Sequence, residues 1–259
     1  MIKMNQIISK FRSHKRLIII LSITFLICVA GFLWSQKIWC DYDTNYYKHF
    51  DDAKTDINNS FSQIATGPTD SISKKLDIII EMQTKLEDNI DAYCDVSPIV
   101  KWQSFIDQYN KKINNCESQK DIMNQFSSEL NTVTEYLKIE QQLANIILVA
   151  NEKTNQNNQA DKWELIEPFW RQAGIEILNL SNTEQFNATK TVAIEKITSI
   201  ADSWQQLSSA NKAQDMQKFQ DSTMNLTKTY NSIVEISNTS KLQTGKLFSD
   251  LSVSYKKLY

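Results

Sequence analysis

The chain has 259 residues, among them only four glycines and three prolines, and a formal net charge of −2. Strand-rich folds need many turns built from these two residues, so the composition argues against a sandwich, barrel or propeller and favours an all-α protein. All 30 acidic residues but only 23 of the 28 basic ones lie beyond residue 34, which gives that part a charge of −7 and argues against nucleic-acid binding.

The N-terminal segment has the pattern of a transmembrane signal anchor. Residues 1–16 contain five lysines and arginines and no acid, and residues 17–34 are uncharged and almost wholly apolar. At about 1.5 Å per residue, a helix over 17–34 is about 27 Å long, which is enough to cross the hydrocarbon core of a bilayer. Because basic flanks stay inside, we expect a single-pass protein of the cell membrane, with 1–16 as a cytoplasmic tail and the bulk of the chain extracytoplasmic.

Two tryptophans stand at the end of this segment and just beyond it. A cleaved signal peptide and a lipoprotein are the alternatives to an anchor. Trp34 and Trp39 stand where amphipathic rings favour lipid headgroups, so we predict that both lie at the membrane interface. A cleaved signal peptide is the main alternative, but its apolar run is usually only about 7–15 residues long. A lipoprotein would use Cys28, but Ile27 before it does not suit the cleavage that lipidation needs.

Apolar residues recur at intervals of three and four through the rest of the chain, which is typical of amphipathic helices. The first apolar stripe continues the membrane helix outward to Ile64, and Gly67-Pro68 ends it. Ser71 and either Ser181 or Thr183 are start signals for later helices. In chain order, the later stripes predict helices over 72–93, 99–113, 122–147, 168–180, 186–207 and 211–258. The stretch 237–245 of the last is thin in apolar residues, which predicts either a kink or weak packing there.

Each predicted helix has one apolar face, and these faces must be buried by helix-on-helix packing. We therefore expect an elongated antiparallel bundle of about six to seven helices. The segment 151–159 contains no apolar residue and is typical of a loop or linker. It divides the outer region into a first part, 35–153, and a second part, 160–259, which form either two domains or one.

Three cysteines lie beyond the apolar segment, in a region where disulfides can persist. Two helices of similar length that run out and back return Cys94 to the level of Cys40, so Cys40–Cys94 is the favoured pair. A straight helix from residue 98 would place Cys116 about 27 Å from Cys94, so pairing of Cys94 with Cys116 requires a bend. Reduced thiols are the remaining alternative.

The chain is poor in the residues that catalysis and metal binding use. It has two histidines, His14 in the tail and His49 outside, and no metalloprotease, nucleophile-elbow or phosphate-loop motif. Asp52 and Asp56 share a helix face with His49, where a divalent ion could bind, but a solvated acidic face is the simpler interpretation. The sequence therefore predicts no enzyme activity, no cofactor and no metal site.

One group of residues could line a ligand pocket. Glu164 and Glu167 lie between Trp163 and Trp170, and carboxylates beside aromatic rings occur in sugar clefts. Glu167 and Arg171 also have the i,i+4 spacing of an ion pair, so an ordinary helix surface is the preferred interpretation.

Together these features favour a non-enzymatic scaffold or protein-interaction module. It would be anchored to membrane lipid through 17–34 and would present a helical bundle to a protein partner or to further copies of itself. The alternative is a helical ectodomain that senses a small molecule and signals through a separate partner. A cavity lined by Trp163, Trp170 or Trp204 would favour this alternative.

Overall fold

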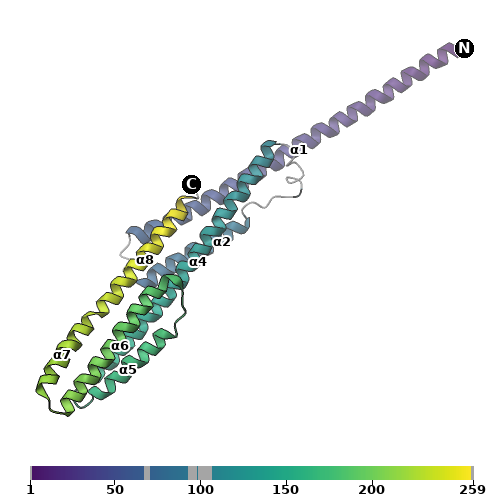
Figure 1. The fold of residues 1–259 in the computed structure, drawn as a ribbon. Helices are drawn as coiled ribbons and strands as arrows, with labels where there is room; N and C mark the ends of the chain where they lie inside the picture. The colour runs from purple at the N-terminus through teal and green to yellow at the C-terminus, as the bar shows by residue number, and fades with distance from the viewer. Residues whose placement is uncertain (1, 67–70, 93–97, 99–106, 258–259) are drawn as a thin grey trace. The chain divides into compact units, whose positions relative to one another are not determined.

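The computed structural model of the chain describes residues 2–66, 71–92, 98 and 107–257 (Figure 1). These residues form helices and connecting turns and contain no strand, so the all-α prediction is confirmed. The elements are α1 (Ile2–Thr66), α2 (Ile72–Ala92), α4 (Asp107–Gln156), the 3-10 helix η2 (Trp163–Leu165), α5 (Ile166–Leu178), α6 (Glu184–Lys212), α7 (Met216–Asn231) and α8 (Ile233–Lys256).

Helix α1 contains, among the described residues, the one segment that is long and apolar enough to cross a membrane. Its most apolar 18-residue window has a mean hydropathy of 2.5, and its side chains are exposed, as at Phe25. Thr24 lies within the segment, and its hydroxyl donates to the carbonyl of Ile20 at 2.9 Å. This polar group is therefore satisfied inside the helix, as a hydrocarbon surrounding requires.

The chain folds as two compact units, each built from segments that are distant in the sequence. The first comprises Met1–Ala53 and Asp91–Lys120, and the second comprises Lys54–Ile90 and Asp121–Tyr259. The segment 151–159 does not lie between the units, because residues on both sides of it belong to the second. Separate folding of 35–153 and 160–259 stays a prediction.

The first unit has a small core where α1 meets the beginning of α4. Trp39 is buried with Ile113, and the rings of Trp39 and Tyr109 stack with their centroids 4.0 Å apart. An ion pair between Lys112 and Asp43 joins the same two helices. Helix α1 is thus a packing element of this unit as well as the carrier of the apolar segment.

The cysteines differ from the favoured pairing. Cys116 is buried and disulfide-bonded, whereas Cys40 is a free, exposed thiol, so a disulfide through Cys40 is wrong. Cys94 lies outside the described residues. Helix α4 begins at Asp107, about 14 Å before Cys116, and residues 99–106, over which the distance argument assumed a straight helix, also lie outside the described residues.

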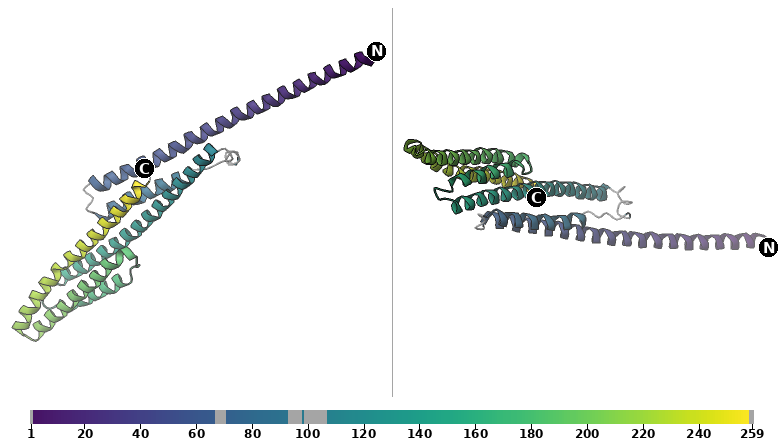
Figure 2. Two further views of the ribbon diagram at one scale, coloured as in Figure 1. Left: turned by 45° about the horizontal axis from the view of Figure 1, so that its top comes forward. Right: turned by 90° about the horizontal axis from the view of Figure 1, so that it is seen from below.

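In the second unit, α6 packs against α5, α7 and α8, which lie beside it in Figures 1 and 2. Thr183 begins α6, because its Oγ1 accepts a hydrogen bond from the backbone N–H of Phe186 at 3.2 Å. Of the two predicted start signals, Thr183 rather than Ser181 is therefore the cap. The buried face of α6 includes Phe186, Ala193, Ile197, Ile200, Trp204 and Leu207.

Three predicted interruptions of helices are wrong. Helix α4 is continuous where the sequence predicted a new start after residue 113, and it continues to Gln156 through most of the predicted loop. Buried side chains at Cys116, Met123 and Thr154 hold these polar stretches in the helix. The predicted kink at 237–245 is instead a break at Ser232, whose hydroxyl donates to the carbonyl of Thr229 and competes with the helical pattern.

Candidate functional site

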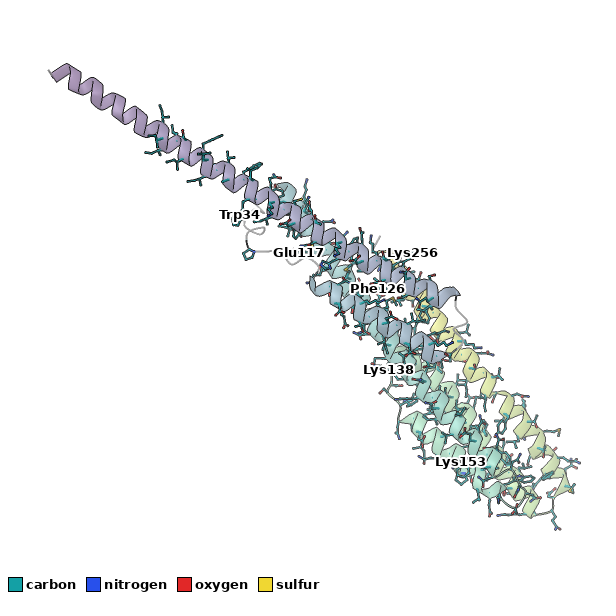
Figure 3. All side chains as sticks on the ribbon, turned by 180° about the vertical axis from the view of Figure 1, so that it is seen from behind. Trp34, Glu117, Phe126, Lys138, Lys153 and Lys256 are labelled. Carbon is teal, nitrogen blue, oxygen red and sulfur yellow. The ribbon has the colours of Figure 1, made fainter. Side chains whose placement is uncertain are left out.

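The two predicted membrane-interface tryptophans have different surroundings. Trp34 is 59% exposed and stands on α1 at the end of the apolar segment (Figure 3). Trp39 is only 4% exposed, because its ring packs on Tyr109 and edge-on against Tyr42. Trp34 is thus free to meet lipid headgroups, a role that stays a prediction, whereas Trp39 is a core residue of the first unit.

The tryptophans of the predicted ligand pocket are packing residues. Trp170 is completely buried, and its Nε1–H donates to the hydroxyl of Thr154 at 2.8 Å. Trp163 is half-buried, with its ring centroid 5.8 Å from that of Phe219 and 6.4 Å from that of Trp204. These rings pack together between η2, α6 and α7.

The charged members of that group are bound in ion pairs between helices. Arg171 pairs with Glu167 on its own helix, as the spacing predicted, and its Nη2 lies 2.9 Å from Asp202 on α6. Glu164 pairs with Lys212 at the end of α6. These contacts join η2 and α5 to α6 and do not favour a ligand role for Glu164, Glu167 or Arg171, which stays untested.

A cavity elsewhere in the second unit has the features of a binding site. It has a volume of about 480 Å³ and lies between α2, α4 and α8. Small-molecule sites are typically about 300–1,000 Å³, with mostly apolar walls and a few polar groups. The apolar lining includes Leu137, Leu143 and Ile147 of α4 and Ile233, Ile236 and Phe248 of α8.

The polar centre of this cavity is the carboxylate of Glu140 on α4. Its side chain is buried, and it accepts hydrogen bonds from the hydroxyls of Ser240 and, at 3.1 Å, Thr244 on α8. The hydroxyl of Tyr136 donates to the backbone carbonyl of Ser240 at 3.3 Å. These three bonds link α4 to α8 along one side of the cavity.

Burial dominates the electrostatics of this site. Loss of water raises the pKa of the Glu140 carboxyl above its ordinary value, while the hydrogen bond from Thr244 and the positive charge of Lys75 lower it. The pKa of Tyr136 is also raised, first by its own burial and then by the negative charge of Glu140. Lys75 of α2 and Lys241 of α8 are the basic residues that line the cavity.

The sequence contained a signal for this site that the reasoning above did not use. Glu140 stands three residues after Leu137 and three before Leu143, so a carboxylate occupies the buried stripe of α4. Ser240 and Thr244 have i,i+4 spacing in the stretch of α8 that is thin in apolar residues. The buried positions of that stretch are hydroxyls that bond to Glu140.

Replacement of Glu140 by glutamine should change how stability depends on pH. The folded carboxyl has the higher pKa, so the folded wild type binds the proton more tightly and loses stability as the pH rises through the interval between the unfolded and folded pKa values. Glutamine does not titrate. Denaturant unfolding at several pH values should therefore show Glu140→Gln gaining stability relative to wild type as the pH rises above the ordinary pKa of a glutamate carboxyl, about 4.3. A difference that is constant or shrinks would contradict the burial of an ionised carboxyl here.

Among the residues that the structure describes, no three His, Cys, Asp or Glu side chains are grouped as metal ligands. The Glu140 cavity offers a buried carboxylate, two hydroxyls and an apolar wall, and these groups can recognise a bound molecule. The chain matches no protein-family model, no curated protein and no solved structure. Function is accordingly argued from the residues of this chain alone.

Proposed function

We propose that the chain is a non-enzymatic, membrane-anchored interaction protein whose helices form an elongated antiparallel bundle outside the cell membrane. The observation that carries this proposal is that α1 contains both the apolar segment and residues that pack in the two units. One end of this helix exposes an apolar segment of membrane-spanning length, and the other buries Trp39 in the first unit and Ile57 in the second. The proposed lipid anchor and the residues that α1 contributes to the two units therefore belong to one continuous helix.

The orientation follows from charge. The five basic residues of 1–16 stay on the cytoplasmic side, and the rest of the chain, with its charge of −7, lies outside. Such a chain is held at the lipid by residues 17–34 and exposes helical surfaces beyond the headgroups. Lateral partners in the same membrane, including further copies of the chain, would meet these surfaces.

Exposed apolar side chains on α8 suggest where a helical partner would bind. Leu242 is 75% exposed, more than Phe25 in the apolar segment, and Val253 is 56% exposed three turns later on the same face. Water contact with such side chains is unfavourable, and an amphipathic helix from a partner would cover them.

In-cell photo-crosslinking tests this proposal. A photoreactive residue would replace Leu242 or Val253 in the full chain, and Lys153, an exposed residue of α4 (Figure 3), would carry it in a control. We expect a discrete crosslinked product from α8 positions, in the membrane fraction, and none from Lys153. Equal products from all three positions, or none from α8, would contradict an interaction surface there.

The Glu140 cavity favours a second candidate function, a ligand-sensing ectodomain. The cavity between α2, α4 and α8 has the volume and the polar centre of a small-molecule site. A ligand that contacts three helices at once could change how they pack. Signalling would then pass to a separate partner.

A further inference from the structure

The cavity between α2, α4 and α8 contains an incompletely compensated charge. Glu140 is 6% exposed, and its hydrogen-bond donors, Ser240 and Thr244, are neutral hydroxyls. Among the described residues, it forms no ion pair, and Lys75 acts on it only from a longer distance. A buried carboxylate without a cation is unfavourable, so a ligand ammonium that reached Glu140 would be strongly favoured.

The edge of the same cavity carries the opposite charge. Lys75 is half-buried on α2, and Lys241 is exposed on α8, directly after Ser240. A ligand with only a positive charge would be repelled by these two lysines. A ligand with only a negative charge would lie close to the Glu140 carboxylate without compensating its charge.

We propose that this cavity binds a small zwitterion with an apolar body, of the size of a branched-chain amino acid. Its ammonium donates to Glu140, its carboxylate faces Lys75 and Lys241, and its body lies against the apolar wall that includes Leu143 and Ile236. This binding would specify the ligand of the second proposed function, ligand sensing. Only the biological role of the binding rests on that function.

Gly245 lines the cavity from α8, and a Cβ atom placed on it would meet no other atom within 4 Å. Its φ is not positive, so a side chain is compatible with the helix there. Replacement by phenylalanine should therefore occupy part of the cavity without unfolding α8.

Isothermal titration of the full chain in phosphatidylcholine nanodiscs tests the proposal. The probes are L-leucine, 3-methylbutylamine, which lacks the carboxylate, and 4-methylpentanoate, which lacks the ammonium. We expect saturable binding of leucine and affinities at least about tenfold weaker for the other two probes. No saturable heat with leucine, or an equal affinity for either single-charge probe, would overturn the proposal.

Variants separate the cavity from other binding. Glu140→Gln should weaken leucine binding at least about tenfold, and Gly245→Phe should abolish it. Gly174→Ala, on α5 and away from the cavity, is the matched control and should bind as wild type does. Far-UV circular dichroism and thermal unfolding establish that each variant is folded. Unchanged binding in folded Gly245→Phe or Glu140→Gln would overturn the proposal.

These outcomes are independent of membrane anchoring and of crosslinking at α8. A chain that fails to bind leucine can still be anchored and crosslinked, and a chain released from the membrane can still bind leucine. Failure of the inference is therefore distinguishable from failure of the proposed interaction function.

Discussion

Replacement of Trp170 by alanine should lower the free energy of unfolding by about 3–5 kcal/mol. Trp170 is completely buried in the second unit, where its ring lies edge-on to Tyr230 with centroids 5.8 Å apart. Its Nε1–H also donates to Thr154 of α4, so the substitution leaves a cavity and removes a buried hydrogen bond. Denaturant unfolding of the full chain in detergent micelles, followed by circular dichroism, measures the loss.

Two further substitutions give this prediction its controls. Trp163→Ala should lower the free energy of unfolding less, because Trp163 is only half-buried. Trp170→Phe should lower it by about 1–3 kcal/mol through the lost hydrogen bond and part of the ring. Losses of equal size at Trp163 and Trp170 would show that Trp170 is not the central packing residue of this region.

Arginine at both Phe25 and Ile27 should release the chain from the membrane. Both side chains are exposed on α1 inside the apolar segment, so neither substitution disturbs packing. Each arginine near the centre of a membrane helix is unfavourable by about 2.5–3.5 kcal/mol, and two together remove the preference for lipid. Sedimentation after alkaline extraction should move the chain from the membrane pellet to the supernatant.

The matched control replaces the same two residues with leucine, which keeps the segment apolar. That variant should stay in the pellet and dissolve only in detergent. Retention of the double-arginine variant in the pellet would show that another part of the chain holds it at the membrane.

Local signals in the sequence were sufficient for the helical fold. Few glycines and prolines excluded strands, and the spacing of apolar residues located the buried faces, as Ile57 on α1 and Ile197 on α6 illustrate. The start of α6 was predicted at Ser181 or Thr183, and the structure shows that Thr183 is the cap. These properties depend on residues within one or two turns of each other.

What the sequence did not yield depends on contacts between distant segments. Glu140 meets Ser240 and Thr244 from 100 and 104 positions along the chain, a juxtaposition that no local pattern reveals. The continuity of α4 depends on burial of Cys116 and Met123 by other segments. The polar residues beside them in the sequence suggested an interruption instead. The favoured disulfide partner, Cys40, is a free thiol, because cysteine pairing also depends on contacts between distant segments.

Thiol labelling at Cys40 tests the central claim, that an N-terminal anchor holds the helical units outside the membrane, most directly. Cys40 is a free, exposed thiol six residues beyond Trp34, and Cys28 lies within the apolar segment. A charged maleimide that cannot cross lipid is applied to intact cells before and after permeabilisation. The account predicts labelling before permeabilisation that is lost in Cys40→Ser, and labelling of Cys40 only after permeabilisation would contradict it.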